Sequence, residues 1–334
     1  MSQKKIPILL VVLLIVTCVF CSGCNELQEG AKVYRVGIVG GVEAFTEIAD
    51  GFIDGLTDLG YIQGENIIYD SQIGNYDQAG LENVTNKFVE DKVDLIFVFP
   101  TEAAIVAKSS TNNTEIPVVF SIAGVEGNSL VDSVGEPGGN ITGVRYPGPD
   151  LVVKRFEILL EIAPHIKKHY VPYDPNYPNG PPTLEALRPV AASYGVVLIE
   201  DQVTSVEELI SSLESLPTSN NSDIDSVQIL PELLTQTPSG WSALCNFTQE
   251  NKLPLVGSML ASAEMGAIFS YCVEFFEVGN SASPLADKVL KGKQAGLIPL
   301  VTPEAHLRIN YNLTQKLNLT VNDGLLNLAD EIIN

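Results

Sequence analysis

The residues best placed for binding chemistry lie where predicted strands give way to loops. Acidic side chains occupy three of these positions, Glu43, Glu102 and Glu232. In open parallel sheets, ligands bind outside the carboxyl ends of the strands, where loop amides and helix N-termini point. Three carboxylates around one cleft would favour a cationic or amine-bearing ligand.

Small and polar residues at the other strand ends complete the set of candidates. The predicted ligand-binding residues are Gly41, Val42, Glu43, Thr101, Glu102, Ser121, Asp174, Asn176, Tyr177, Glu232 and Ser258. Each has a plainer alternative role as a solvated loop residue or a helix cap. Thr101, for example, could simply cap the helix that begins near it.

The chain carries no motif of enzyme chemistry. Residues 37–41, Gly-Ile-Val-Gly-Gly, have neither the spacing of the dinucleotide fingerprint nor the Lys-Ser/Thr of a P-loop. The Gly-x-Ser-x-Gly elbow of hydrolases is also absent. The histidines, His165, His169 and His306, are interpreted as surface or structural residues. We therefore expect no enzyme activity, no catalytic residue, no metal site and no cofactor.

The N-terminus has the composition of an export signal over residues 1–24. Two lysines precede an apolar run of 16 residues, which is followed by Ser-Gly-Cys. That ending resembles a lipobox, in which Cys24 would be lipidated, although Cys21 stands where lipoproteins usually carry an aliphatic residue. The alternative is an uncleaved membrane anchor, for which the run is short. Either way, the sequence predicts a protein anchored to the outer face of the cell membrane, with residues 25–32 as a tether.

Two cysteines remain beyond the signal, Cys245 and Cys272, and they could form a disulfide or remain as buried thiols.

Seven Asn-x-Ser/Thr sequons make surface glycosylation a further expectation for an exported chain. The sequons begin at Asn83, Asn112, Asn140, Asn220, Asn246, Asn312 and Asn318.

Composition places the chain among globular proteins of more than one core. It has 334 residues, of which 45% are hydrophobic, and a formal net charge of −22. The acidity argues against a nucleic-acid partner, which requires a basic surface.

Apolar patterning predicts strands and helices that alternate along the chain. Residues 33–40, 94–99 and 117–122 are continuous apolar runs typical of strands buried on both faces. Helical spacing of apolar residues separates them, for example from Phe45 to Leu59. The alternation restarts near residue 145 and predicts a second unit of similar build. The fold class is therefore α/β, with two doubly wound parallel sheets.

An ordered set of short segments resembles one family of exported proteins. The segments are Gly51–Asn66, Lys92–Ile96, Thr101–Ala104, Ile116–Phe120, Pro137–Val144 and Leu290–Lys293. Together they are similar to the substrate-binding component of ABC importers of the tryptophan/tyrosine-like type, which has a type I periplasmic-binding-protein fold. The resemblance covers about residues 34–330.

The resemblance implies two lobes joined by a three-segment hinge. Lobe 1 would comprise residues 33–144 and about 273–299, and lobe 2 residues 145–272 and about 300–330. It also implies a small-molecule ligand between the lobes and an ABC permease with its ATPase as partner. Residues 121–126 and 175–180 depart from the family's usual loops, so an acid that would pair with an amino acid's ammonium is missing from one expected place.

The function expected from the sequence is capture of an amino-acid-like or amine-bearing solute outside the cytoplasm. Delivery to an importer is the first hypothesis. The alternative is a receptor domain of the same fold that reports ligand occupancy to a membrane signalling partner.

Overall fold

The computed structural model describes residues 32–217 and 224–334. Residues Tyr34–Asn334 form one compact unit. The predicted export signal, Cys24 and nearly all of the tether lie outside the described residues and stay predictions. Within residues 32–217 and 224–334, no helix is both long enough and apolar enough to cross a membrane.

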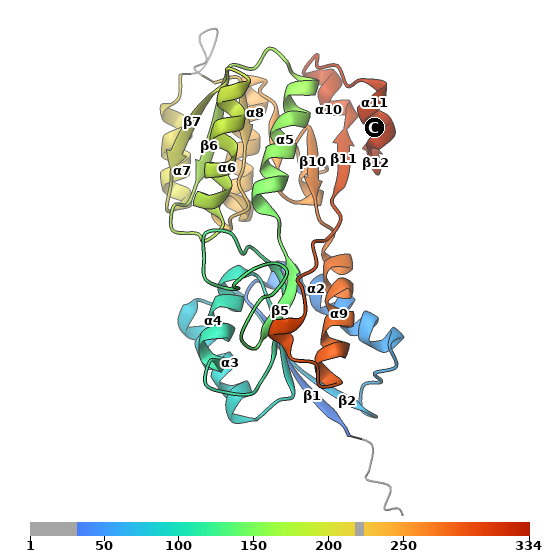
Figure 1. The fold of residues 1–334 in the computed structure, drawn as a ribbon. Coiled ribbons are helices and arrows are strands. Elements are labelled where there is room, and N and C mark those ends of the chain that lie inside the picture. The colour runs from blue at the N-terminus through green and yellow to red at the C-terminus, as the bar shows by residue number, and fades with distance from the viewer. Residues whose placement is uncertain (1–31, 218–223) are drawn as a thin grey trace, which may run out of the picture. The chain divides into compact units, whose positions relative to one another are not determined.

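The first half of the chain builds a five-stranded parallel sheet with the order β2-β1-β3-β4-β5 (Figure 1). Its strands are β1 (Tyr34–Gly40), β2 (Ile67–Ile73), β3 (Leu95–Phe99), β4 (Val118–Ala123) and β5 (Ile141–Arg145). All residues of β3 and β4 are buried, as their continuous apolar runs predict.

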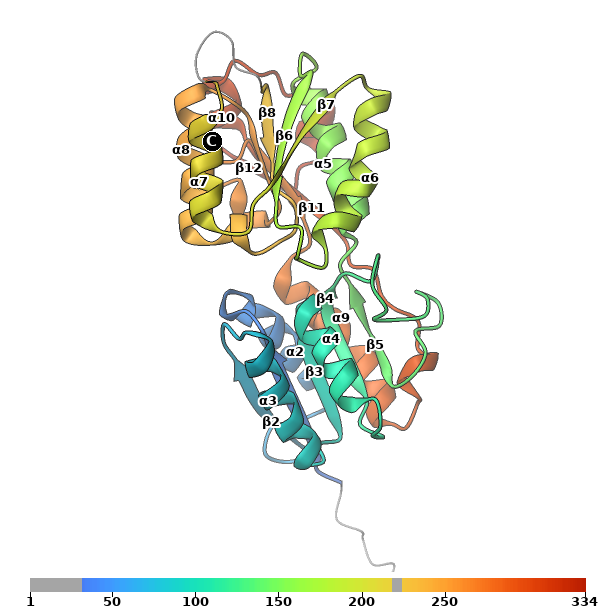
Figure 2. The ribbon, with the colours of Figure 1, turned by 90° about the vertical axis from the view of Figure 1, so that its left-hand side faces the viewer.

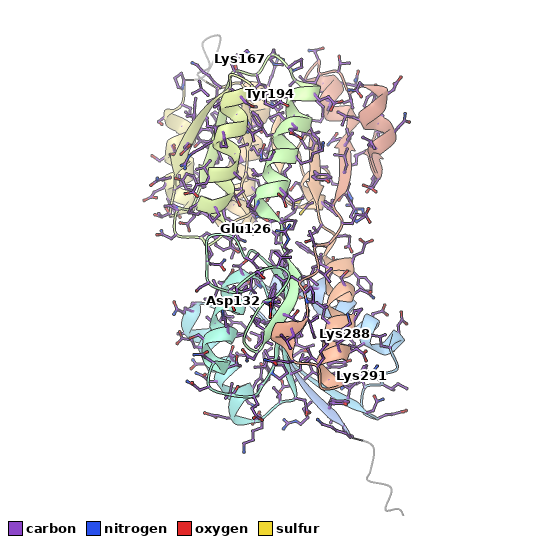
Figure 3. All side chains as sticks on the ribbon, viewed as in Figure 1. Glu126, Asp132, Lys167, Tyr194, Lys288 and Lys291 are labelled. Carbon is purple, nitrogen blue, oxygen red and sulfur yellow. The ribbon has the colours of Figure 1, made fainter. Side chains whose placement is uncertain are left out.

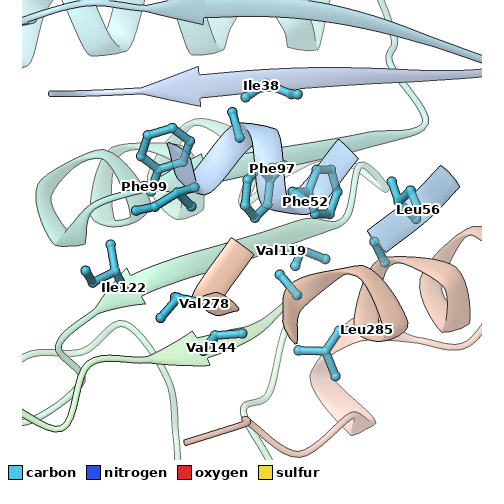
Figure 4. Close-up of a cluster of buried hydrophobic side chains, with 14 of the residues drawn as sticks. Ile38, Phe52, Leu56, Phe97, Phe99, Val119, Ile122, Val144, Val278 and Leu285 are labelled. Atoms are coloured by element: carbon cyan, nitrogen blue, oxygen red, sulfur yellow. The ribbon is translucent and has the colours of Figure 1, made fainter. Parts of the chain in front are cut away.

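Helices cover both faces of this sheet. One face holds α2 (Thr46–Asp58) and α9 (Phe275–Leu290), and the other holds α3 (Gln78–Glu90) and α4 (Thr101–Thr111). Phe52 of α2 stacks on Phe97 of β3, with ring centroids 3.8 Å apart, inside the apolar cluster of Figure 4.

Helices α2 and α9 approach each other closely although they are far apart in sequence. A Cβ at Gly51 would lie 2.0 Å from the carbonyl oxygen of Phe276, and one at Gly279 would lie 2.0 Å from that of Ile48. Glycine is therefore required on both helices at this contact.

The second sheet has seven strands in the order β12-β11-β10-β9-β8-β6-β7. Its strands are β6 (Lys168–Tyr173), β7 (Val197–Gln202), β8 (Ser226–Gln228), β9 (Leu255–Gly257), β10 (Phe269–Cys272), β11 (His306–Asn310) and β12 (Glu331–Ile333). Pairing is parallel except between β10 and β11. The antiparallel β11 was not anticipated, because it comes from the C-terminal tail after a long excursion.

Helices again divide between the two faces of the second sheet (Figure 2). One apolar cluster includes α5 (Gly148–Ile162) and α6 (Gly180–Ser193), together with α10 (Tyr311–Lys316) and α11 (Asp323–Leu328). The other includes α7 (Val206–Ser215) and α8 (Pro238–Asn251). Both sheets are thus wound on two sides, and the predicted fold class is confirmed.

Two features of the helices were not expected from the sequence pattern. Helix α6 begins at Gly180 although two prolines follow at once, because prolines are tolerated in the first turn of a helix. Helix α8 was not predicted at all. Its buried residues have helical spacing, but two of the five are Gly240 and Thr248, which weakens the apolar stripe.

The chain passes between the sheets three times. The crossovers follow β5, join β10 to α9, and join η4 (Ala295–Leu297) to β11. Arg145 connects the first and third of them, because its backbone nitrogen donates to Val301 and its Nε donates to the hydroxyl of Thr302 at 2.8 Å. Its guanidinium also pairs with Glu126, labelled in Figure 3, at 2.7 Å.

Candidate functional site

An aromatic cavity lies among loops that belong to both sheets, with about 390 Å³ of empty space, part of which is open to solvent. Four of its lining side chains are aromatic: Phe45, Tyr146, Tyr177 and Phe275. Phe45 ends η1 (Glu43–Phe45), just after β1, while Phe275 begins α9. Their rings meet edge to face with centroids 4.8 Å apart, a favoured arrangement for aromatic pairs.

One polar wall of the cavity joins the start of α4 to the loop after β6. The side-chain amide of Asn179, which lines the cavity, contacts the hydroxyl of Thr101, with the Nδ2–Oγ1 distance 3.1 Å. The Tyr177 hydroxyl donates to Glu102 Oε2 at 3.0 Å. Burial raises the pKa of Glu102, and burial together with the charge of Glu102 raises the pKa of Tyr177.

The carboxylate of Glu232 lines the cavity but is already engaged by its own loop. It accepts hydrogen bonds from the backbone nitrogens of Leu234 at 2.6 Å and Thr235 at 2.9 Å. The Thr235 hydroxyl donates to it as well. Burial raises its pKa, and these hydrogen bonds oppose that effect. Glu232 thus binds the first backbone amides of η2 (Leu234–Gln236) and has limited capacity left for a ligand.

The opposite wall contains a buried guanidinium. Arg155 of α5 is fully buried. Its Nε donates to the carbonyl of Tyr271 at 2.8 Å, and its Nη2 donates to the hydroxyl of Tyr146 at 3.1 Å and the carbonyl of Ser258 at 3.2 Å. Tyr146 and Ser258 both line the cavity, so the guanidinium lies directly behind this wall.

Five of the predicted ligand-binding residues lie at or beside this cavity. Tyr177, Glu232 and Ser258 line it. Thr101 and Glu102 sit one contact away, through Asn179 and Tyr177. Their ligand contact stays a prediction, but the structure brings them together.

The other predicted residues do not line the cavity: Gly41, Val42, Glu43, Ser121, Asp174 and Asn176. Glu43 is exposed, and its backbone nitrogen donates to Asn75. The Ser121 hydroxyl donates to the carbonyl of Val278 at 3.3 Å, and so faces α9. Asp174 accepts from the backbone nitrogen of Asn176 at 2.8 Å within its own turn. Because Glu43 is one of the three acids expected around the cleft, its absence from the cavity lining weakens the argument for an amine ligand.

Most of the apolar lining was missed by sequence reasoning. Besides three of the four aromatic residues, the missed residues are Pro100, Ile122, Asn179, Leu233, Gln236, Met259 and Cys272. The prediction was based mainly on polar residues directly after strands. Phe45 and Pro100 could have been predicted as well, because each stands close to a strand end that was already a candidate position.

The remaining cysteines are free thiols, and the disulfide alternative is excluded. Cys245 and Cys272 are both buried, and burial raises the pKa of Cys245 to about 11.

His169 is also fully buried. Its ring nitrogens lie 2.6 Å from Ser226 Oγ and 3.3 Å from Gln228 Oε1. It is therefore structural, as expected. No group of three His, Cys, Asp or Glu in residues 32–217 and 224–334 is arranged to hold a metal.

Two wound sheets, three crossovers and a cavity at the facing loops define the class of solute-binding proteins with a type I periplasmic-binding-protein fold. Residues 35–333 match the family described as ABC transporter substrate binding protein, and the chain belongs to that family. The family consists of substrate-binding proteins and is not an enzyme family.

Several relatives are similar along nearly the whole chain. A tyrosine-binding protein of Clostridioides difficile (strain R20291) is 29% identical over 299 residues, which cover 88% of this chain and 84% of that relative. A conserved domain protein of Vibrio cholerae O1 biovar El Tor is 26% identical, with a TM-score of 0.80 over 90% of this chain and 100% of that one. A Streptococcus pneumoniae ABC domain solved with L-Trp has the same fold, with a TM-score of 0.80, the same coverage and 23% identity.

Proposed function

We propose that the protein captures a small aromatic, amino-acid-like solute outside the cytoplasm and delivers it to an ABC permease with its ATPase. The observation that carries this proposal is the cavity with its four aromatic side chains, drawn from loops of both sheets. Family membership and the tyrosine-binding relative support it.

The two lobes would be residues 33–144 with about 273–299, and residues 145–272 with about 300–330. Each of these ranges holds one of the two sheets, apart from Arg145 of β5 and the short strand β12, and the three crossovers would serve as the hinge. The N-terminal segment, with Cys24 as the lipid-bearing residue, would attach the protein to the outer face of the membrane. A single acyl chain holds weakly, so stable attachment would need two chains or an added contact.

Isothermal titration calorimetry of the purified protein with L-tyrosine, L-tryptophan and L-phenylalanine tests the binding step. We expect one-to-one binding of at least one of them and a higher melting temperature in its presence. Absence of heat and of a thermal shift with all three would refute the amino-acid assignment. Delivery is tested separately, by uptake of the labelled amino acid in the native host with and without the gene.

A further inference from the structure

A buried positive charge beside the cavity has no negative partner in the described chain. Arg155 is fully buried, and no carboxylate of residues 32–217 and 224–334 lies within ion-pair distance of it. A guanidinium stays charged at all physiological pH values. A buried charge without a counter-charge is costly, so a fold that keeps one is expected to meet an anion at that place.

Two polar groups at the same place are unpartnered. Arg155 Nη1 and the hydroxyl of Ser258 are both buried, and neither has a hydrogen-bond partner. They are neighbours, because Arg155 Nη2 donates to the carbonyl oxygen of Ser258. The thiol of Cys272 is also near, since its sulfur lies 4.0 Å from the Tyr146 hydroxyl to which Arg155 donates. Cys272 and Ser258 line the cavity, and the guanidinium of Arg155 lies directly behind Ser258.

We propose that Arg155 and Ser258 receive a carboxylate of the ligand, so that the ligand class is an aromatic carboxylate rather than a simple aromatic amine. This inference rests on the proposed function and specifies its ligand. A carboxylate accepts several hydrogen bonds at once, and it pairs well with the parallel donors of a guanidinium. The Ser258 hydroxyl supplies a further donor, while Tyr146 and Phe275 contact the ring.

A purely structural role for Arg155 predicts a different pattern. Arg155 also ties Tyr146, in the first crossover, to Tyr271 in β10. If that were its whole role, removing it would weaken every ligand to the same degree. If it binds a carboxylate, the loss falls on ligands that carry one.

Calorimetry with three matched probes separates these roles: L-tyrosine, 3-(4-hydroxyphenyl)propionate, which lacks the ammonium, and tyramine, which lacks the carboxylate. The wild-type protein should bind the two carboxylates at least about 30-fold more tightly than tyramine. Arg155→Gln should remove that preference, Arg155→Lys should keep part of it, and Ser258→Ala should reduce it about tenfold. Arg188→Gln is the matched control, because Arg188 is exposed and pairs with Glu200 on the surface.

Each result decides one of the two proposals. Equal affinity for tyramine and L-tyrosine, or an equal loss of all probes in Arg155→Gln, overturns the carboxylate site and leaves aromatic binding intact. If no aromatic amino acid binds, a saturable rise in melting temperature with benzoate but not with benzylamine supports the anion site alone. If benzoate causes no such rise either, the anion site is overturned as well. If Arg155→Gln does not fold, the wild-type preference and Ser258→Ala still decide.

Discussion

His169 should make the stability of the protein fall as the pH is lowered below neutrality. Burial lowers its pKa from the ordinary value of 6.5 to about 4, against a smaller opposing effect of its hydrogen bond with Gln228. In the unfolded chain the imidazole takes up a proton near pH 6.5, whereas in the folded protein it stays neutral down to about pH 4. Between these values the unfolded state binds more protons, so the free energy of unfolding decreases with decreasing pH.

The size of this effect follows from the difference between the two pKa values. One pKa unit corresponds to about 1.4 kcal/mol, so His169 should contribute a loss of about 3 kcal/mol between pH 6.5 and pH 4. The slope should approach about 1.4 kcal/mol per pH unit in the middle of that range.

Urea denaturation of the wild type and His169→Gln at several pH values from 7 to 4 measures this contribution. The difference between the two curves isolates His169 from the other titrating groups, including His306, whose raised pKa acts in the opposite direction. His165→Gln, at an exposed position four residues earlier, is the matched control. If the wild-type and His169→Gln profiles run parallel over this range, the argument from burial is wrong.

Three further predictions concern the cavity, the helix contact and the surface. Phe275→Ala should weaken binding of the best aromatic amino acid by roughly tenfold or more in calorimetry, because it removes a lining ring and its contact with Phe45; an unchanged affinity would move the ligand elsewhere. Gly279→Ala should lower the free energy of unfolding by about 1–3 kcal/mol in urea titrations, since its Cβ would meet a backbone oxygen. Gly135→Ala, where that space is open, serves as its control. In a host that glycosylates sequons, glycopeptide mass spectrometry should find Asn112 modified and Asn140 bare, because the Asn140 amide donates to Ile116 at 2.6 Å; a glycan on Asn140 would contradict this.

The fold could be predicted from the sequence because its signals are local. The run that became β3 is apolar without interruption, that of β4 is interrupted only by Ser121, and α2 shows its stripe of Ile48, Phe52 and Leu56. Pairing over long sequence distances had no such signal. The contact between α2 and α9 joins residues more than two hundred positions apart, and only the family resemblance placed α9 beside the first sheet.

The site could be predicted only in part because polar residues at strand ends have two competing uses. Glu232 follows β8 as expected and Ser121 lies within β4, yet their side chains bind local backbone amides and a helix carbonyl. Nothing in the residue type distinguishes such a use from ligand binding. Arg155 was missed because it does not stand at a strand end. It lies in a helix, and it reaches the cavity wall only because three separate segments converge on it.

The cavity and the crossovers share residues, and this gives ligand binding a direct mechanical consequence. Tyr146 follows β5 in the first crossover, while Cys272 and Phe275 flank the second. A ligand in the cavity therefore contacts the segments about which the lobes would turn. To move the lobes from 1:99 to 99:1 in favour of one arrangement, the ligand must favour it by about 5.5 kcal/mol. A carboxylate that neutralises Arg155 is the strongest single source of such a preference at this site, because that charge is already desolvated and its donors are already fixed.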